Sequence, residues 1–427
     1  MQSMQKITNI NLSYFCYFFN CFETDAVGKL CYNTNITEPK PSMRQARRGG
    51  SFYMKKWIDA DFGAHLSLLK TLAAIPAPSH HEEQRAAFIK NWLEEAGAEK
   101  VYIDAAQNVI LPFLRDDSDA ITVYMAHTDV VFPDLTPLPV TQDGNILRAP
   151  GVGDDTANVA AILTCARYIL EQGLRPRESV LLVLNSCEEG LGNLKGVRQI
   201  VSDFSPHIRE LISFDCTLDE GLICRAVGSE RWRISAATAG GHSYGDFGRP
   251  NAVHRMAQLV SRLYQQQLPA WPDQHTTYNV GVISGGTSVN TIAQDAQILY
   301  EYRSDDARAL DFMRKQFFRI MEEVKDQDVS WSRELLGERP CGGAVDTAAW
   351  EKLLQRCAAA IENVTGVRPG RRSGSTDANI PLSQGIPAVT FGLYRGGGAH
   401  TREEWLDIDS LKPGLELCFE LVTSHFV

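Results

Sequence analysis

Residues 121–131, ITVYMAHTDVV, set the architecture of this chain, because an apolar run there ends directly in a histidine and an aspartate. Two runs of the same kind follow, SVLLVLN at 179–185 and ELISF at 210–214, with mostly apolar residues. Such runs are typical of strands buried on both faces of a sheet. TANVAAILTCARYILEQGL, at 156–174, has the apolar spacing of a helix, and Gly173 suits its end. Alternating strands and helices predict an α/β domain with a covered mixed sheet.

Polar side chains stand close after each apolar strand and just before the intervening helix. They are His127 and Asp129, Glu188 and Glu189, Asp215, Asp154 and Asp155, and His400 after the later strand AVTF and a glycine run. The carboxyl ends of the strands in an open α/β sheet form one edge, where ligands bind. No Lys or Arg lies immediately beside these acids in the sequence, and converging carboxylates repel one another unless a cation separates them. The sequence therefore predicts a metal site at this edge.

The charge balance of the predicted site favours two divalent ions. The candidate ligands are His127, Asp154, Glu189, Asp215 and His400. Their three carboxylates carry three negative charges, so two divalent ions and one hydroxide would make a neutral cluster. Nitrogen and oxygen donors without a thiolate suit catalytic Zn²⁺, and Mn²⁺ or Co²⁺ would also fit.

The composition excludes several other classes of protein. The chain has 427 residues, 44% of them hydrophobic, which suits two or three domains with their own cores. With 42 Lys and Arg against 52 Asp and Glu, the net charge of -10 argues against a nucleic-acid binder. No run approaches the roughly 18 apolar residues of a membrane-spanning helix, and ten cysteines without CxxC pairs favour free thiols. We therefore expect a cytoplasmic protein that binds neither nucleic acid nor membrane.

Residues 1–53 differ from the rest of the chain. They mix aromatic residues, asparagine and three of the ten cysteines without a regular period, and they lack the basic start and cleavage site of a secretory signal. From Met54 the sequence MKKWIDADFGAHLSLLKTLAAIP has the apolar spacing of a helix. We therefore expect residues 1–53 to be a disordered or non-native leader and the folded protein to begin at Met54.

Residues 229–336 have a different pattern. RWRISAATAGG, TTYNVGVISGG and AQILYEYRSD predict strands, and NAVHRMAQLVSRLYQQQ and ARALDFMRKQFFRIMEEVKD predict helices, in the order β-α-β-β-α. With one more strand, this order is typical of a small ferredoxin-like α+β unit with helices on one face of its sheet. The prediction is an inserted unit at 229–336 that divides the α/β domain into 54–228 and 337–427.

Five motifs resemble those of a known family. AHTD (126–129), GVGDD (151–155), CEEGLGN (187–193), SFD (213–215) and GGAHT (397–401), in this order and at these separations, are similar to the motifs of metallopeptidase family twenty. This family of co-catalytic zinc hydrolases includes peptidase T, carboxypeptidase G, acetylornithine deacetylase and aminoacylase. The resemblance covers residues 54–427. It implies a zinc-peptidase catalytic domain whose inserted lid pairs with the lid of a second subunit, so we expect a homodimer.

The resemblance also implies roles for the residues of the metal site. It makes Asp154 the bridge between two ions, with His127 and Asp215 completing one site and Glu189 and His400 the other. Asp129 matches the acid that orients the imidazole of His127, and Glu188 matches the general base. The peptide bond between Asp154 and Asp155 is expected to be cis. Where many relatives have Lys and Gly after the paired acids, this chain has Thr156, Ala157 and Asn158, so substrate preference does not transfer by analogy.

Further residues match substrate-contacting positions of the family. His242 resembles the histidine that stabilises the oxyanion, often across the dimer interface. Asn290 and Arg303 resemble residues that hold a substrate carboxylate or backbone; read alone, Arg303 is an ordinary strand-end salt bridge. A turn that would line the specificity pocket contains Gly374, Ser375 and Thr376.

The predicted function is hydrolysis of amide bonds in small substrates, with short peptides as the first candidates. A hydroxide activated by the two metal ions would attack the amide carbonyl, and Glu188 would pass its proton to the leaving nitrogen. The alternative is an N-acyl-amino-acid deacylase or deacetylase, because both classes share the metal chemistry. A non-catalytic protein that binds metal on the same scaffold is a third hypothesis, which the presence of Glu188 and all five ligand positions disfavours.

Overall fold

The computed structural model describes residues 43–427. Residues 1–42, most of the predicted leader, lie outside this range. The first helix, α1 (Met43–Ala74), runs through Met54 without interruption, so the described helix begins earlier than the predicted start of the fold. Within 43–427 no helix combines the length and apolar character that crossing a bilayer would require.

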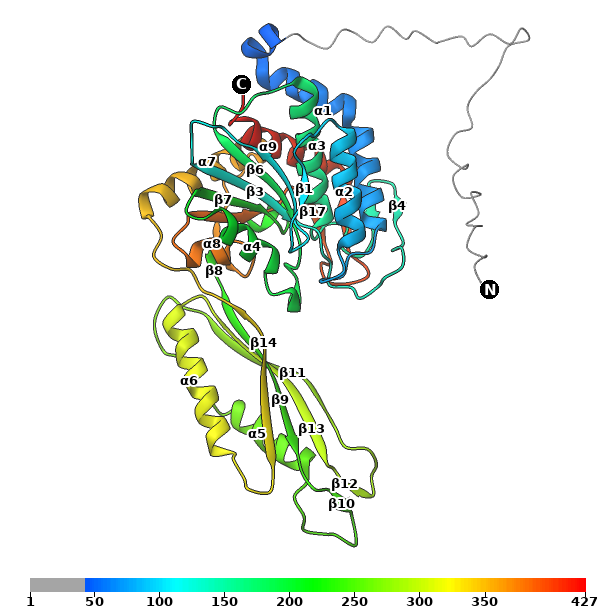
Figure 1. Cartoon of the computed structure of the whole chain (residues 1–427), viewed down its shortest axis with the longest axis vertical. Coiled ribbons are helices and arrows are strands. Elements are labelled where there is room, and N and C mark those ends of the chain that lie inside the picture. The colour runs from blue at the N-terminus through cyan, green and yellow to red at the C-terminus, as the bar shows by residue number, and fades with distance from the viewer. Residues whose placement is uncertain (1–42) are drawn as a thin grey trace, which may run out of the picture.

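An eight-stranded mixed sheet forms the centre of the main domain (Figure 1). In spatial order its strands are β1 (Tyr102–Ile103), β2 (Val109–Phe113), β6 (Ser179–Asn185), β3 (Ile121–His127), β7 (Ile208–Phe214), β16 (Ala388–Phe391), β8 (Leu222–Ala226) and β15 (Arg371–Gly374). The four central strands, β6, β3, β7 and β16, are parallel. Their carboxyl ends therefore lie at one edge, and the predicted α/β class with a mixed sheet is confirmed.

Helices cover both faces of this sheet. On one side lie α1, α2 (Glu83–Glu95), α3 (Thr156–Gln172), α7 (Thr347–Thr365) and α9 (Leu411–Thr423); on the other lie α4 (Lys195–Phe204) and α8 (Asn379–Ser383). Strand β3 shows why its sequence lacks polar alternation. Tyr124 and Ala126 pack into the first layer, whereas Val123 and Met125 pack into the second. A small second sheet in the order β17-β18-β5-β4 borders the main one and comprises β4 (Thr141–Asp143), β5 (Ile146–Arg148), β17 (Arg395–Gly397) and β18 (Trp405–Asp407).

The segment VYIDAAQNVILPFL, at 101–114, has the β-branched and apolar residues typical of one strand, but it does not form one strand in the structure. It forms β1 and β2, which pair antiparallel across a turn. The carboxylate of Asp104 accepts hydrogen bonds from the backbone N–H groups of Ala106 and Asn108, at 2.8 and 2.9 Å, and Gln107 has a φ of 76°. An Asp that satisfies its own following backbone favours a turn over a continuous strand.

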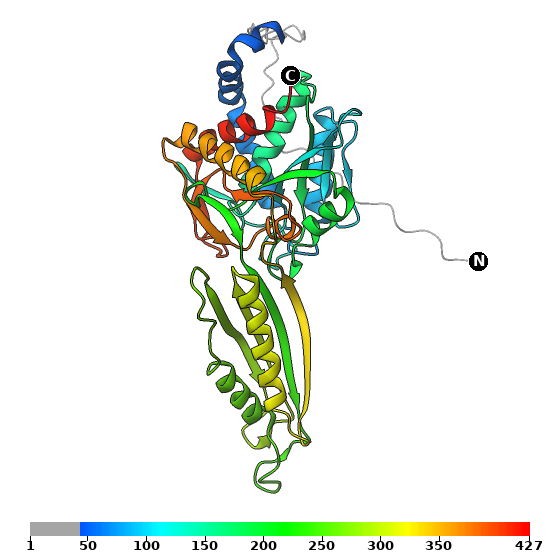
Figure 2. The same ribbon diagram turned by 90° about the vertical axis from the view of Figure 1, so that its left-hand side faces the viewer.

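The inserted unit, residues 228–339, is called the lid below. It is an antiparallel sheet with two helices on one face, and it extends away from the main domain (Figure 2). Its strands lie in the order β11 (Thr276–Gly285), β13 (Asp295–Ser304), β9 (Gly228–Ala237) and β14 (Ser330–Arg339), and its helices are α5 (Ala252–Leu263) and α6 (Ala307–Glu323). Strand β14 is the additional strand that the sequence pattern required, and the order is the ferredoxin-like one. A short pair, β10 (Gly241–His242) and β12 (Thr291–Ile292), forms the far tip.

Two helical glycines give a matched test of the main-domain packing. In α9, a Cβ added at Gly414 would lie 1.6 Å from the carbonyl oxygen of Leu393, so Gly414→Ala must displace the helix. We expect it to lower the free energy of unfolding by about 1 to 3 kcal/mol. In α1, a Cβ at Gly63 would meet nothing within 4 Å, so Gly63→Ala should raise stability by about 0.5 to 1 kcal/mol. Urea unfolding measures both; equal effects of the two substitutions would contradict this packing.

Candidate metal centre

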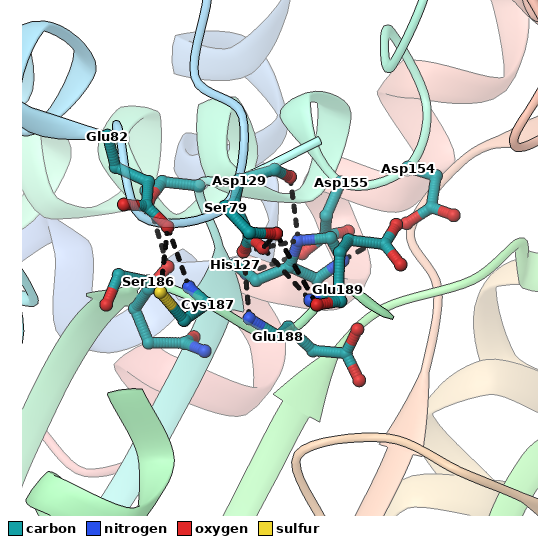
Figure 3. A network of polar contacts seen from close by, with 12 residues as sticks. Ser79, Glu82, His127, Asp129, Asp154, Asp155, Ser186, Cys187, Glu188 and Glu189 are labelled. Atoms are coloured by element: carbon teal, nitrogen blue, oxygen red, sulfur yellow. Dashed lines mark hydrogen bonds and ion pairs between the residues drawn. The ribbon is translucent and has the colours of Figure 1, made fainter. Parts of the chain in front are cut away.

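The candidate ligands of the main domain meet at the carboxyl edge of the parallel strands. Figure 3 shows three of them, His127, Asp154 and Glu189, beside Glu188 and Asp129. His127 is the last residue of β3, and Asp215 directly follows β7. Glu188 and Glu189 come from the loop after β6, and Asp154 comes from the loop that leads into α3. The convergence that the sequence predicted for these side chains is therefore present in the fold.

The donor atoms fall into three groups whose members lie within 4.8 Å of one another. The groups are His127, Asp154 and Asp215; Asp154, Glu189 and His400; and His127, Glu188 and Glu189. Asp154 belongs to the first two groups through different atoms. Its Oδ1 lies 3.1 Å from Nε2 of His127, and its Oδ2 lies 3.2 Å from Nε2 of His400. Nε2 of His400 also lies 3.1 Å from Oε1 of Glu189. One carboxylate thus faces two separate clusters, which is the geometry of a bridging ligand.

The electrostatics of these groups indicate a demand for positive charge. Burial raises the pKa of Asp215 well above its usual value and raises that of Glu189 to about 7. Burial alone would lower the pKa of His127, but the surrounding carboxylates raise it well above its usual value. Hydrogen bonds to Asp154 and Glu189 raise the pKa of His400 to about 11. Imidazoles that favour protonation beside acids that resist ionisation mark a site suited to cations.

The residues present fit a pair of divalent ions. Every one of the three groups combines imidazole nitrogen with carboxylate oxygen, which are donors that Zn²⁺, Mn²⁺ and Co²⁺ accept. Asp154, His127 and Asp215 would hold one ion, and Asp154, Glu189 and His400 would hold the other.

Asp129 connects the end of β3 to the loop after β6. Its two carboxylate oxygens accept hydrogen bonds from the backbone N–H groups of Glu188 and Glu189, each at 2.9 Å, and Ser79 donates to it at 2.6 Å. Nδ1 of His127 lies 3.5 Å from Oδ1 of Asp129 and 3.1 Å from its carbonyl oxygen. The role of Asp129 in orienting the imidazole of His127 remains a prediction. The structure shows in addition that the same carboxylate binds the backbone of both glutamates.

Asp155 and the residues after it stabilise the loop that presents Asp154. The peptide bond between the two aspartates is cis, as the resemblance implied. Oδ2 of Asp155 accepts a hydrogen bond from the backbone N–H of His127 at 2.8 Å. Asn158 donates to Asp155 at 2.5 Å and accepts from the backbone N–H of Leu393 at 2.9 Å. Asn158, which follows the two positions that differ from the family pattern, therefore has a structural role in this chain.

Glu404 holds the same loop, although its sequence context does not indicate this role. Its carboxylate accepts hydrogen bonds from the backbone N–H groups of Gly151, Gly153 and Asp154, at 2.8 to 2.9 Å, and its residue is only 2% exposed. In the sequence it stands in the charged run TREEW, which resembles an exposed turn.

Arg339 corrects the expectation that no basic residue neutralises the acids. It lies far from them in sequence, yet its Nη1 is 3.0 Å from Oε1 of Glu188 and both side chains are buried. A neutralising charge is thus supplied by the last residue of β14, where the chain returns from the lid.

The predicted lid residues do not reach the metal donors of their own chain. His242 ends β10 and Asn290 directly precedes β12, at the tip of the lid (Figure 1). Arg303 lies on β13 and pairs with Glu301 of the same strand, with Nε and Nη2 at 3.0 and 3.1 Å from its carboxylate oxygens. This contact is the ordinary salt bridge that the sequence left open.

The turn after β15 lies nearer to the site. Ser375 accepts hydrogen bonds from Nη1 of Arg339 through its carbonyl oxygen and its Oγ, at 3.3 and 3.2 Å. Thr376 is buried, with its Oγ1 at 2.8 Å from Oγ1 of Thr390. A Cβ at Gly374 would lie 2.7 Å from Ile223, so this position has little room for a side chain. The turn thus contacts the glutamate cluster through Arg339.

A conservative substitution at Glu404 tests how the metal-binding loop is held. Glu404→Gln replaces one oxygen acceptor by an amide donor that faces backbone N–H groups, which should displace Asp154. We expect metal affinity or activity to fall by roughly 10- to 100-fold, as for other partners of metal ligands. The control is Glu403→Gln, whose side chain is exposed. Metal content after dialysis against graded chelator measures the effect; equal content in the two variants would remove Glu404 from this role.

Comparison with known proteins identifies a sequence family, a relative and similar folds that all agree with a metal-dependent hydrolase. The sequence matches the model of Peptidase family M20/M25/M40 over residues 123–424. It is 22% identical over 363 residues to a succinyl-diaminopimelate desuccinylase of Corynebacterium glutamicum, covering 82% of this chain and 93% of that protein.

Two solved structures are similar in fold. The dipeptidase Dug1p of Saccharomyces cerevisiae aligns with a TM-score of 0.68 at 16% identity, over 87% of this chain and 98% of that one. The YXEP protein of Bacillus subtilis, a dinuclear metal-binding peptidase, aligns with a TM-score of 0.58 at 16% identity, over 86% and 99%. With the family match spanning most of the chain and the donor groups in place, this protein belongs to peptidase family M20/M25/M40 and is a metal-dependent hydrolase of amide bonds.

Proposed function

We propose that this protein is a dinuclear zinc hydrolase of short peptides in which Glu188 is the general base. The observation that carries the proposal is the position of Asp154, whose two oxygens face the two donor clusters. Glu188 belongs to the third cluster, with His127 and Glu189, so its carboxylate lies beside the proposed ion pair. Zinc is proposed because the donors are nitrogen and oxygen without thiolate.

The chemistry divides between the ions and the chain. Two divalent ions, when bound, supply a water acidified toward neutral pH and an electrophile for the amide carbonyl. Glu188 accepts the proton of the attacking water and delivers it to the leaving nitrogen, first as base and then as acid. Asp129 keeps Glu188 in place through its backbone N–H, at 2.9 Å. These steps require the base within hydrogen-bond reach of the substrate, so they depend on the loop after β6.

His242 has the protonation pattern of an oxyanion donor. Its Nδ1 accepts hydrogen bonds from the backbone N–H groups of Tyr244 and Gly245, both at 3.2 Å. A nitrogen that accepts carries no proton, so the neutral imidazole carries its hydrogen on Nε2. The backbone N–H of His242 donates to Asp246 at 2.8 Å, which fixes the start of this loop. The side chain thus offers one N–H donor where negative charge would develop.

The lid tip lies far from the metal donors of its own chain, so His242 would need a second subunit to reach a metal site (Figure 1). We propose that a homodimer forms through the lid and that His242 acts in the site of the second copy. Asn290 would accompany it, because its carbonyl oxygen accepts a hydrogen bond from Ser243 at 3.0 Å. Arg303 would hold a substrate carboxylate by exchanging its contact with Glu301, and the turn Gly374 to Thr376 would line the pocket.

A second candidate is an N-acyl-amino-acid deacylase. The relative from Corynebacterium glutamicum favours it, because that protein is named a succinyl-diaminopimelate desuccinylase.

A cytoplasmic location is part of the proposal as well. All seven cysteines of residues 43–427 are free, and six of them are buried, as expected in a reducing compartment.

Substitution of the base tests the mechanism and the substrate class together. Glu188→Gln keeps the volume but removes the proton acceptor, so turnover should fall by at least about 100-fold while two metal ions per chain remain bound. Turnover is measured with di- and tripeptides and with N-acetyl and N-succinyl amino acids, and metal by elemental analysis. Turnover of acylated amino acids alone would favour the deacylase. Near wild-type activity of Glu188→Gln on any active substrate would exclude the proposed base.

Subunit mixing tests His242. His242→Ala should lower kcat on the order of 100-fold, and Glu188→Gln should also be inactive. Statistical mixing of the two variants gives hybrid dimers with one intact site, so roughly a quarter of wild-type activity should return. Mixing Glu188→Gln with the double variant is the matched control and should stay inactive. The absence of recovery, or a twofold effect of His242→Ala, would sink the shared-site proposal.

A further inference from the structure

Arg339 is the last residue of β14, where the chain leaves the lid and returns to the main domain. It pairs with Ser229 near the start of β9, so it lies at the point where both connecting strands cross between the two domains. Its side chain is only 5% exposed, although arginine is rarely buried without partners.

The partners of its guanidinium all belong to the main domain. Nη1 donates to Oε1 of Glu188 at 3.0 Å, and to the carbonyl oxygen and Oγ of Ser375 at 3.3 and 3.2 Å. Nη2 donates to the carbonyl oxygen of Glu188 in a short contact. One planar group therefore binds both the carboxylate and the backbone of the same glutamate. The rigid fork of an arginine suits this double contact, and a lysine ammonium cannot reproduce it.

Two details indicate that the contact between Arg339 and Glu188 orients the glutamate and does not serve only to stabilise the junction between the lid and the main domain. Nε of Arg339 is buried and has no hydrogen-bond partner within residues 43–427, so the side chain tolerates an unsatisfied donor. Within residues 43–427, the Glu188 carboxylate accepts hydrogen bonds only through Oε1. Oε2 is thus the oxygen left for a proton-transfer partner.

We propose that Arg339 is the positioning residue of Glu188. It fixes Oε1 and the carbonyl oxygen of the glutamate, so Oε2 keeps one direction at the metal donors. The inference rests on the proposed base role of Glu188. Arg339 is also the last residue of a lid strand, at a point where the lid joins the main domain. The position of the base therefore depends on how this strand enters the main domain. Arg339 thus links a lid strand directly to the carboxylate of the base.

Arg339→Lys tests the proposal, with Arg333→Lys as the matched control. Arg333 lies on the same strand, is exposed and contacts the ring of Phe318. A lysine at 339 keeps the charge but not the fork, so kcat should fall by roughly tenfold or more while KM stays within about twofold, because only the orientation of the base is lost. Two metal ions per chain should remain, and Arg333→Lys should match the wild type. Arg339→Gln serves the same comparison if the lysine variant does not fold.

A double-mutant cycle separates positioning from a structural role. If Arg339 acts only through Glu188, Arg339→Lys should lower the residual kcat of Glu188→Gln by less than about twofold. An equal loss in both backgrounds, loss of metal, or wild-type kcat for Arg339→Lys would each overturn the inference. If Glu188→Gln itself retains wild-type activity, the proposed base fails instead, so the two failures are distinguishable.

Discussion

Concentrated negative charge at the carboxyl edge of the parallel strands is the condition around which the main domain is organised. Burial raises the pKa of Asp215 well above its usual value, and the same edge contains Asp154 and Glu189. Such a cluster is costly without cations. The surrounding structure holds these groups in place with hydrogen bonds from backbone N–H groups to Asp129 and Glu404. The covered sheet lets this costly arrangement persist, because the loops that carry Glu189 and Asp215 begin at β6 and β7, which are almost wholly buried.

The sequence predicted those features that depend on neighbours along the chain. Strands β3 and β6 are buried at every position, so their sequences lack polar alternation and can be recognised without any structure. Since His127 ends β3 and Asp215 follows β7, their convergence followed from the rule that parallel strands end at one edge. The ferredoxin-like order of the lid followed from helical and strand periods in the same way.

Other features depend on contacts between distant segments and left no local signal. Arg339 lies 151 residues from Glu188 in the chain, and Glu404 lies 250 residues from Asp154. Each stands among charged residues that normally face solvent. The division of residues 102–113 into two strands has a local cause, because the side chain of Asp104 competes with strand pairing. The partner of Arg303 could not be chosen from sequence, since an acid two positions away and a substrate carboxylate offer the same chemistry.

The interleaving of the central sheet has a consequence for synthesis of the protein. Strand β16, made after the lid, lies between β7 and β8, made before it. His400 and Glu404 also belong to the segment after the lid, and one donor group and the clamp on the loop at 151–154 depend on them. A ribosome-bound chain that has finished β8 therefore exposes an incomplete sheet and an incomplete ligand set while more than a hundred further residues are translated. With the ligands proposed above, the second metal ion would bind only after His400 has been translated and Glu404 holds the loop at 151–154.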